Sequence, residues 1–251
     1  MSLELTILGC SGSGPAPGNP ASGYLVRSAS TSVWLDTGPG TFMALGEHID
    51  PAQVDAVTIS HLHADHSSDF LGFSHYIAYR NTPPRPIPVF LPPGGVATFA
   101  AYLGAGPGHA FFDVFDLEEL AGPAERRVGD ITLTFAPAEH SVPTNAVRCE
   151  SGQRTLTFSG DTGPGGGFAA LATGSHVVLS EAGLNPPSPG EGPQHHLSGS
   201  DAGRIARVAG AGRLILTHLA PTLRAEDIHA AAAAEFPGEI LLAEPGMVVA
   251  I

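Results

Sequence analysis

The chain has 251 residues, of which 43% are hydrophobic and 14% charged, and all 11 of its basic residues are arginine. Its formal net charge of −13 repels polyanions, so nucleic acid is a disfavoured partner, and no apolar run reaches the roughly 18 residues that a membrane helix needs. Because no secretory signal opens the sequence, we expect a cytoplasmic protein with no membrane partner. The two cysteines, Cys10 and Cys149, are too few for a disulfide framework and are expected to be buried.

Strands are predicted by short runs rich in β-branched residues between glycines and prolines. In chain order they are Leu3 to Leu8, Gly23 to Arg27, Ser32 to Asp36, Ala56 to Ser60, Pro88 to Leu91, Ile131 to Ala136, Thr155 to Ser159, His176 to Ser180 and Arg213 to Thr217. Helices are predicted at Thr41 to His48, Asp69 to Tyr79, Ala97 to Leu103, Ser200 to Val208 with Ser200 as its cap, and Ala225 to Glu235. Because the sequence shows no linker or internal repeat, this order indicates a mixed α/β layered architecture in a single domain, residues 1–251.

Two loops are rich in glycine and proline. The first, Gly9 to Pro20, follows a predicted strand as a dinucleotide-binding loop would, but its prolines prevent a helix from starting where the phosphate would need one. The second, Asn185 to Pro193, is either a lid over a pocket or a solvated connection, and the sequence leaves both open.

The segment after the fourth predicted strand carries the strongest chemical signal. That strand ends at Ser60, and His61, His63, Asp65 and His66 follow within six positions. His61 and His63 project to the same side of an extended turn, whereas Asp65 and His66 come from the next turn of backbone. One short loop can therefore supply ligands to two ions, and imidazole with carboxylate suits zinc, or manganese and iron when oxygen ligands are added.

This H-x-H-x-D-H run resembles the signature of the metallo-β-lactamase superfamily. Three further motifs of the superfamily match His140, Asp161 and His218, and each of these residues follows a predicted strand. The resemblance implies an αββα sandwich of two mixed β-sheets flanked by helices, with two divalent metal ions, zinc or alternatively manganese. It also implies the metal ligands: for the first ion His61, His63 and His140, for the second Asp65, His66 and His218, and Asp161 between them.

Two adjacent divalent ions share a water and lower its pKa from 15.7 towards about 7, which makes a bridging hydroxide nucleophile. With both aspartates ionised, such a centre carries a net charge of about +1 and suits a singly charged phosphodiester. A narrower resemblance concerns Glu181 and His196, which look like the catalytic glutamate and histidine of phosphodiesterases such as ribonuclease Z. A histidine oriented by a carboxylate is a sound general acid, so the expected catalytic residues are Asp65, Glu181 and His196.

The branches of the superfamily differ in substrate. Ribonuclease Z enzymes of bacteria carry a basic arm between the third histidine and the bridging aspartate, but here only Ser141 to Gly160 lie there, and a strand pair needs them. Glyoxalase II enzymes add a helical domain after the core, whereas this chain ends soon after His218. The runs Thr6 to Ser13 and His196 to Gly199 resemble an actinobacterial group associated with cyclic nucleotide hydrolysis.

The expected function is therefore hydrolysis of small cyclic nucleotides by a dinuclear phosphodiesterase. The family resemblance also implies that the protein forms a homodimer. Three alternatives stay open: a transfer-RNA 3′-end endonuclease of the ribonuclease Z kind, a glyoxalase II-like thioester hydrolase, and a metal-binding protein whose catalysis has lapsed. The presence of Glu181 and His196 disfavours the last of these.

Overall fold

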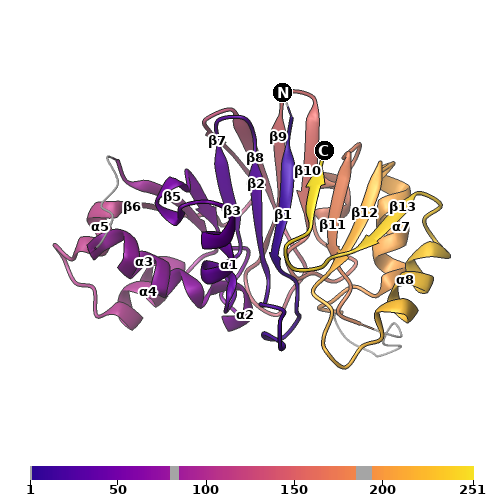
Figure 1. Ribbon diagram of the computed structural model, residues 1–251, viewed down its shortest axis with the longest axis horizontal. Coiled ribbons are helices and arrows are strands. Elements are labelled where there is room, and N and C mark those ends of the chain that lie inside the picture. The colour runs from indigo at the N-terminus through magenta and orange to yellow at the C-terminus, as the bar shows by residue number, and fades with distance from the viewer. Residues whose placement is uncertain (1, 80–84, 185–193) are drawn as a thin grey trace.

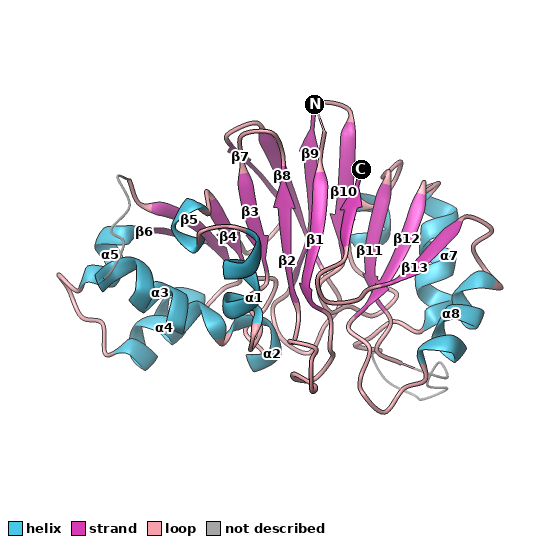
Figure 2. Cartoon of the chain, viewed as in Figure 1, coloured by secondary structure: helices cyan, strands magenta, loops and turns pink. Residues whose placement is uncertain are grey.

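The computed structural model describes residues 2–79, 85–184 and 194–251, which form two seven-stranded sheets packed face to face with helices on both outer faces (Figures 1 and 2). The predicted αββα sandwich of two mixed sheets is confirmed. The predicted loop Asn185 to Pro193 lies outside the described residues.

The first sheet has the strand order β14-β1-β2-β3-β4-β5-β6. Strand β1 pairs antiparallel with both β14 and β2, β2 pairs antiparallel with β3, and β3 to β6 run parallel. Its strands are β1 (Glu4–Gly9), β2 (Gly23–Arg27), β3 (Ser32–Leu35), β4 (Ala56–Thr58), β5 (Ile87–Leu91), β6 (Phe115–Glu119) and β14 (Val248–Ala250).

The second sheet has the order β13-β12-β11-β10-β9-β8-β7 and repeats this mixture. Its strands β7 to β10 pair antiparallel, and β10 to β13 run parallel. Its strands are β7 (Ala124–Val128), β8 (Ile131–Pro137), β9 (Asn145–Ser151), β10 (Arg154–Phe158), β11 (Val177–Glu181), β12 (Arg213–Thr217) and β13 (Glu239–Leu242).

Three hydrophobic clusters of the described residues fill the spaces between the two sheets and between each sheet and its helices. One lies between the sheets and includes Ile7, Leu133 and both cysteines, which are free and buried as predicted. The other two lie under the helices on either side. The helices are α1 (Thr41–His48), η1 (Pro51–Gln53), α2 (Ala64–Ser67), α3 (Asp69–Tyr79), α4 (Gly95–Leu103), α5 (Ala110–Val114), α6 (Phe168–Leu171), α7 (Gly199–Ala209) and α8 (Ala225–Ala233). Within the described ranges, none of them is long and apolar enough to cross a bilayer.

The predicted strands all lie in the sheets, but β6, β7, β9, β13 and β14 were not predicted. Four of these are the edge strands of the two sheets, whereas β9 lies inside the second sheet between β8 and β10. Edge strands carry charged side chains that discourage pairing with other chains, as in the Ala-Glu-Arg-Arg-Val run of β7, so their hydrophobic pattern is weak. The predicted cap of α7 is also wrong: Ser198, not Ser200, accepts from the backbone N–H of Asp201 in a capping box.

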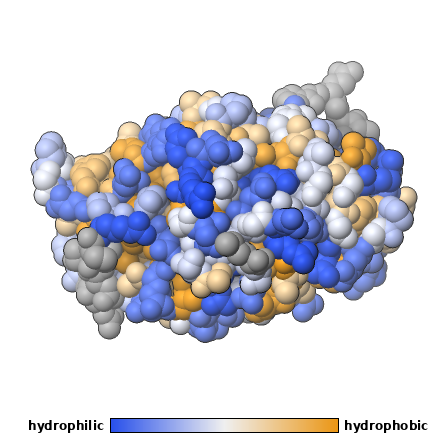
Figure 3. Space-filling model, turned by 90° about the horizontal axis from the view of Figure 1, so that it is seen from above, coloured by the Kyte–Doolittle hydropathy of each residue, from blue (hydrophilic) through white to orange (hydrophobic). Residues whose placement is uncertain are grey.

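The loops that follow β3, β4, β8, β10, β11 and β12 all leave the sandwich at one edge, which is the lower edge in Figure 1. These loops bring functional side chains from distant parts of the sequence together. The opposite edge, seen from above in Figure 3, presents hydrophilic residues with hydrophobic residues interspersed among them.

Candidate metal centre

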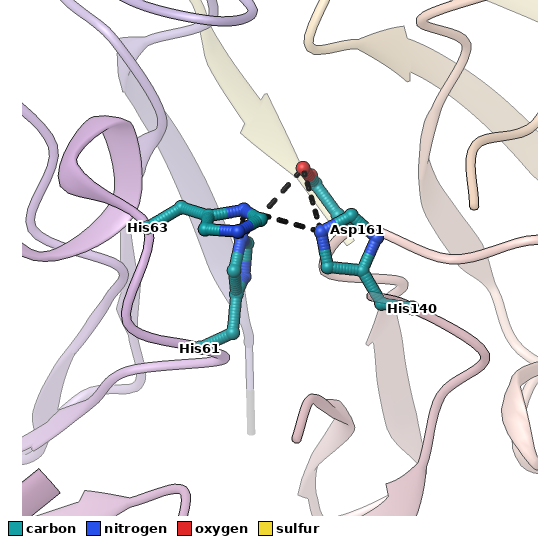
Figure 4. Close-up of side chains that lie close together, drawn as sticks. All are labelled: His61, His63, His140 and Asp161. Atoms are coloured by element: carbon teal, nitrogen blue, oxygen red, sulfur yellow. Dashed lines mark hydrogen bonds and ion pairs between the residues drawn. The ribbon is translucent and has the colours of Figure 1, made fainter. Parts of the chain in front are cut away.

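Three histidines and an aspartate converge from both sheets. His61 and His63 follow β4, His140 follows β8, and Asp161 follows β10, and their ligand atoms all lie within 4.8 Å of one another. The Nδ1 atom of His63 lies 3.0 Å from Nε2 of His61 and 3.2 Å from Nε2 of His140. Figure 4 shows these side chains pointing towards one another and towards the carboxylate of Asp161.

A second group lies beside the first. Asp65 and His66 come from α2, and His218 directly follows β12. Oδ2 of Asp65 lies 3.3 Å from Nε2 of His218 and 3.7 Å from Nε2 of His66, and the three ligand atoms again lie within 4.8 Å of one another.

Asp161 lies between the two groups, and each of its carboxylate oxygens faces one of them. Oδ2 is 3.8 Å from Nε2 of His61 and 4.0 Å from Nε2 of His140. Oδ1 is 3.2 Å from Nε2 of His66 and 3.5 Å from Nε2 of His218. The structure therefore brings all seven predicted metal ligands together, in the two sets that the family resemblance implied.

The chemistry of these atoms fits metal ions. His66 Nε2 and Asp161 Oδ1 are both buried, and neither has a hydrogen-bond partner among the described residues. Leaving such atoms unsatisfied in a protein interior is costly, and a cation that both lone pairs can bind removes that cost. Imidazole and carboxylate are the ligands that zinc prefers in sites of this kind.

Electrostatics around Asp161 favour the charged carboxylate. Burial alone would raise its pKa, but the positive charges that His218 and His66 can carry hold that pKa well below its usual range. Burial would likewise lower the pKa of His66, but Asp161 and Asp36 raise it well above the usual value. For His61, burial and the neighbouring His66 outweigh the charge of Asp161, so its pKa lies well below the usual value and its imidazole is neutral.

Asp36, which the sequence analysis did not single out, orients the histidines from behind. It is fully buried, and its Oδ2 accepts from Nδ1 of His66 at 2.7 Å and from Oγ of Ser60 at 2.8 Å, while Oδ1 accepts from the Ser60 backbone N–H at 2.6 Å. Ser60 Oγ in turn lies 3.0 Å from Nδ1 of His61 and accepts a hydrogen bond from it. Asp36 also has a φ of 53°, and His218 one of 57°, which are sparsely populated values that cluster at functional sites.

His140 is oriented by a different acceptor, because its Nδ1 donates to the backbone carbonyl of His195 at 2.9 Å. The outer nitrogens of His61, His66 and His140 thus all donate to fixed acceptors, which turns their Nε2 lone pairs towards the centre.

Glu181 and His196 form the predicted pair beside the cluster. Glu181 is buried, accepts from the backbone N–H groups of Thr162 at 2.7 Å and Gly183 at 3.2 Å, and lies 3.1 Å from Nδ1 of His196. Burial raises the pKa of Glu181. Burial would lower the pKa of His196, but its hydrogen bond to Glu181 raises that pKa above the usual value. The His196 ring lies 5.1 Å from that of His140 and 5.8 Å from that of His218.

Comparison with known proteins places this centre in a family. Residues 31–219 match the model of the β-lactamase superfamily domain. The chain belongs to this superfamily. Its relatives include the uncharacterized protein Rv1339 of Mycobacterium tuberculosis, 38% identical over 96% of this chain and 89% of that one, and a ribonuclease Z of Mycobacterium bovis, 30% identical over 95% of this chain and 94% of that one.

Another relative in the β-lactamase superfamily is the probable metallo-hydrolase YhfI of Bacillus subtilis, which is 28% identical over 98% of this chain and 99% of that one. The crystal structure of YhfI superposes with a TM-score of 0.87 at 24% identity and covers 100% of both chains. The short form of human tRNase Z shares the fold, with a TM-score of 0.78 at 21% identity over 98% of each chain. The chain is therefore a metallo-hydrolase of the β-lactamase superfamily, and its histidine and aspartate cluster can bind metal.

Proposed function

We propose that this metallo-hydrolase is a dinuclear phosphodiesterase that binds two zinc ions, or alternatively manganese, and hydrolyses small cyclic nucleotides to monophosphates. The observation that carries the proposal is the position of Asp161. Its two oxygens face separate sets of imidazoles, at 3.8 and 4.0 Å on one side and 3.2 and 3.5 Å on the other, as a carboxylate shared between two ions does.

When bound, such an ion pair supplies Lewis-acid charge and a hydroxide nucleophile derived from water. The chain supplies the proton for the leaving group. A new P–O bond forms to the water-derived oxygen, the P–O bond to the ester oxygen breaks, and that oxygen takes the proton of His196. Glu181 holds Nδ1 of His196 and stabilises the protonated ring, so the opposite nitrogen, Nε2, is free to donate.

Asp65 carries a negative charge before the substrate reacts. Burial would raise its pKa, but the hydrogen bond with His218 and the charge of His66 bring that pKa down to about 2. An ionised Asp65 contributes to binding the second ion and can accept a proton from the attacking water. This is the catalytic role that we propose for it.

The charges around the centre favour a substrate with a single phosphate. Most described arginines pair with carboxylates outside the metal centre, and the chain has no lysine. These arginines are Arg27, Arg85, Arg126, Arg148, Arg204, Arg207, Arg213 and Arg224. Since binding of polyanions depends on phosphate neutralisation by such side chains, a small phosphodiester suits this surface better than a transfer RNA.

A second candidate is processing of transfer-RNA 3′ ends, because a relative named ribonuclease Z is 30% identical over 95% of this chain. A glyoxalase II-like thioesterase would use the same metal pair on a thioester carbonyl. The homodimer expected from family likeness remains part of the proposal for either enzyme.

A substrate panel separates these candidates. Zinc-loaded protein is offered cyclic AMP, bis(p-nitrophenyl) phosphate, a precursor transfer RNA and S-lactoylglutathione. We expect turnover of the first two, with a loss of about 100-fold in kcat on cyclic AMP for Glu181→Gln and none for Glu226→Gln, an exposed glutamate on α8. Cleavage of precursor transfer RNA alone would establish the second candidate, and turnover of the thioester alone would establish the third.

A further inference from the structure

Three consecutive residues, Gln194 to His196, run along the rim of the metal centre before α7 begins. The carbonyl of His195 accepts from Nδ1 of His140 at 2.9 Å, and the next side chain, His196, is held by Glu181 at 3.1 Å. One short segment therefore orients a ligand of the first metal site with its backbone and carries the proposed acid on its side chain.

The inner side of this segment lies against Gly163, two residues after Asp161. A side-chain carbon at position 163 would overlap the backbone carbonyl of Gln194, and it would lie 2.9 Å from Oε2 of Glu139. Gly163 is also fixed from below, because its N–H donates to the carbonyl of Glu139 at 2.6 Å. Since its φ is not in the left-handed region, an alanine could adopt the same backbone conformation, and only the space for Cβ is missing.

The outer side of the segment is tethered as well. Nε2 of Gln194 donates to the carbonyl of His196 at 2.9 Å and lies 3.3 Å from Oδ2 of Asp201 in the capping box of α7. The backbone N–H of Leu184 donates to the carbonyl of Leu197 at 3.0 Å. Displacement of the segment from Gly163 would therefore disturb contacts on both sides of it.

We propose that Gly163 is a positioning residue, whose missing side chain lets Gln194 to His196 approach closely enough to orient His140 and His196 together. For His140 this concerns only metal binding. For His196 it rests on the proposed phosphodiesterase function.

The variant Gly163→Ala tests this role, with Gly122→Ala as the matched control because a Cβ at Gly122 meets no atom within 4 Å. We expect Gly163→Ala to weaken zinc binding at the first site by about 10- to 100-fold, measured by chelator competition, since the His195 acceptor moves away from His140. We expect kcat on cyclic AMP to fall about 100-fold, as displacement of a reacting group by ~1 Å does. Zinc affinity and kcat equal to those of Gly122→Ala would overturn the proposal.

The leaving group gives a readout that a loss of stability would not produce. Displacement of His196 should slow release of the alkoxide from cyclic AMP more than release of p-nitrophenolate, which needs no proton. An equal loss on both substrates would contradict the part of the proposal that concerns His196.

A second variant covers the case in which Gly163→Ala does not fold. Gln194→Ala frees the same segment without adding an atom at the centre, and we expect kcat to fall about tenfold with an unchanged circular dichroism spectrum. A wild-type kcat for Gln194→Ala would then overturn the proposal. If the wild type binds zinc but hydrolyses no phosphodiester, the proposed function fails, whereas the zinc affinity of Gly163→Ala still decides the positioning role.

Discussion

The substitution Asp36→Asn tests how the chain prepares its metal ligands. Oδ1 of Asp36 accepts from the Ser60 backbone N–H at 2.6 Å, so an asparagine must keep its carbonyl oxygen there and turn its NH2 group to the Oδ2 position. That position faces Nδ1 of His66 at 2.7 Å. The NH2 group can only donate, so Nδ1 of His66 must become the acceptor and the remaining proton moves to Nε2, the atom that faces Asp161.

An Nε2–H group cannot bind a cation, so the tautomer of His66 must be reversed before the second ion binds, and this reversal costs free energy. Loss of such an outer hydrogen bond weakens metal binding by about 10- to 100-fold, which corresponds to ~1.4 to 2.7 kcal/mol. Zinc titration of the metal-free protein by calorimetry measures this loss. We expect it at the second site, with a smaller effect at the first site through Ser60 and His61.

Asp55→Asn is the matched control, because Asp55 accepts a backbone N–H from Ser32 at 2.9 Å but touches no metal ligand in the described structure. We expect it to bind zinc like the wild type. If Asp36→Asn also binds two zinc ions with wild-type affinity, then Asp36 does not set the tautomer of His66, and the reasoning is refuted.

Three further predictions concern catalysis, metal binding and stability. His196→Ala should lower kcat on cyclic AMP by about 100-fold and on bis(p-nitrophenyl) phosphate by much less, which steady-state kinetics checks; equal losses would remove the acid role. Because the pKa of His66 is raised in the metal-free protein, the second ion must displace the proton of its imidazole. Zinc affinity at that site should therefore fall about tenfold for each pH unit below that pKa, and an affinity that does not depend on pH would contradict this. The hydroxyls of Ser28 and Thr31, at 2.5 and 2.6 Å, hold the pKa of Asp130 below its usual value. Ionised Asp130 therefore stabilises the fold above the pKa that it has in the unfolded chain, and this stabilisation is lost as the pH falls through its pKa in the folded protein. Asp130→Ala should therefore lower the free energy of unfolding at neutral pH by ~1 kcal/mol after solvent screening, which corresponds to a fall of about 2 to 4 °C in Tm. Thermal melts measure this difference, which should shrink in acid.

Much of the fold follows from hydrophobic pattern, because the central strands are buried on both faces. In β11 and in β4 every residue is buried, and such runs are visible in the sequence. The edge strands β6, β7, β13 and β14 and the inner strand β9 lack this signal, since charged, exposed or half-exposed residues interrupt them. Their pairing depends on the neighbouring strand, which a local pattern cannot show.

The metal centre could be predicted from sequence because the spacing of His61 to His66 is distinctive, and because the family resemblance added His140, Asp161 and His218, each of which follows a hydrophobic strand. The outer contacts were not all accessible in this way. Asp36 did carry a signal, since it ends a predicted strand and Asp161 follows another by two residues, but it lies far from the histidine motif in sequence. The carbonyl of His195 carries none, because every residue has a backbone carbonyl and only the fold determines which one faces His140. The metal-ligand roles and the single-domain division remain predictions.

The central claim is that Asp161 is shared by two ions. A crystal structure of the zinc-loaded protein, with anomalous data collected at the zinc edge, tests this claim directly. The account predicts two peaks, one on the Oδ2 side of Asp161 beside His61, His63 and His140, and one on the Oδ1 side beside Asp65, His66 and His218. A single peak, or two peaks that Asp161 does not touch, would contradict it.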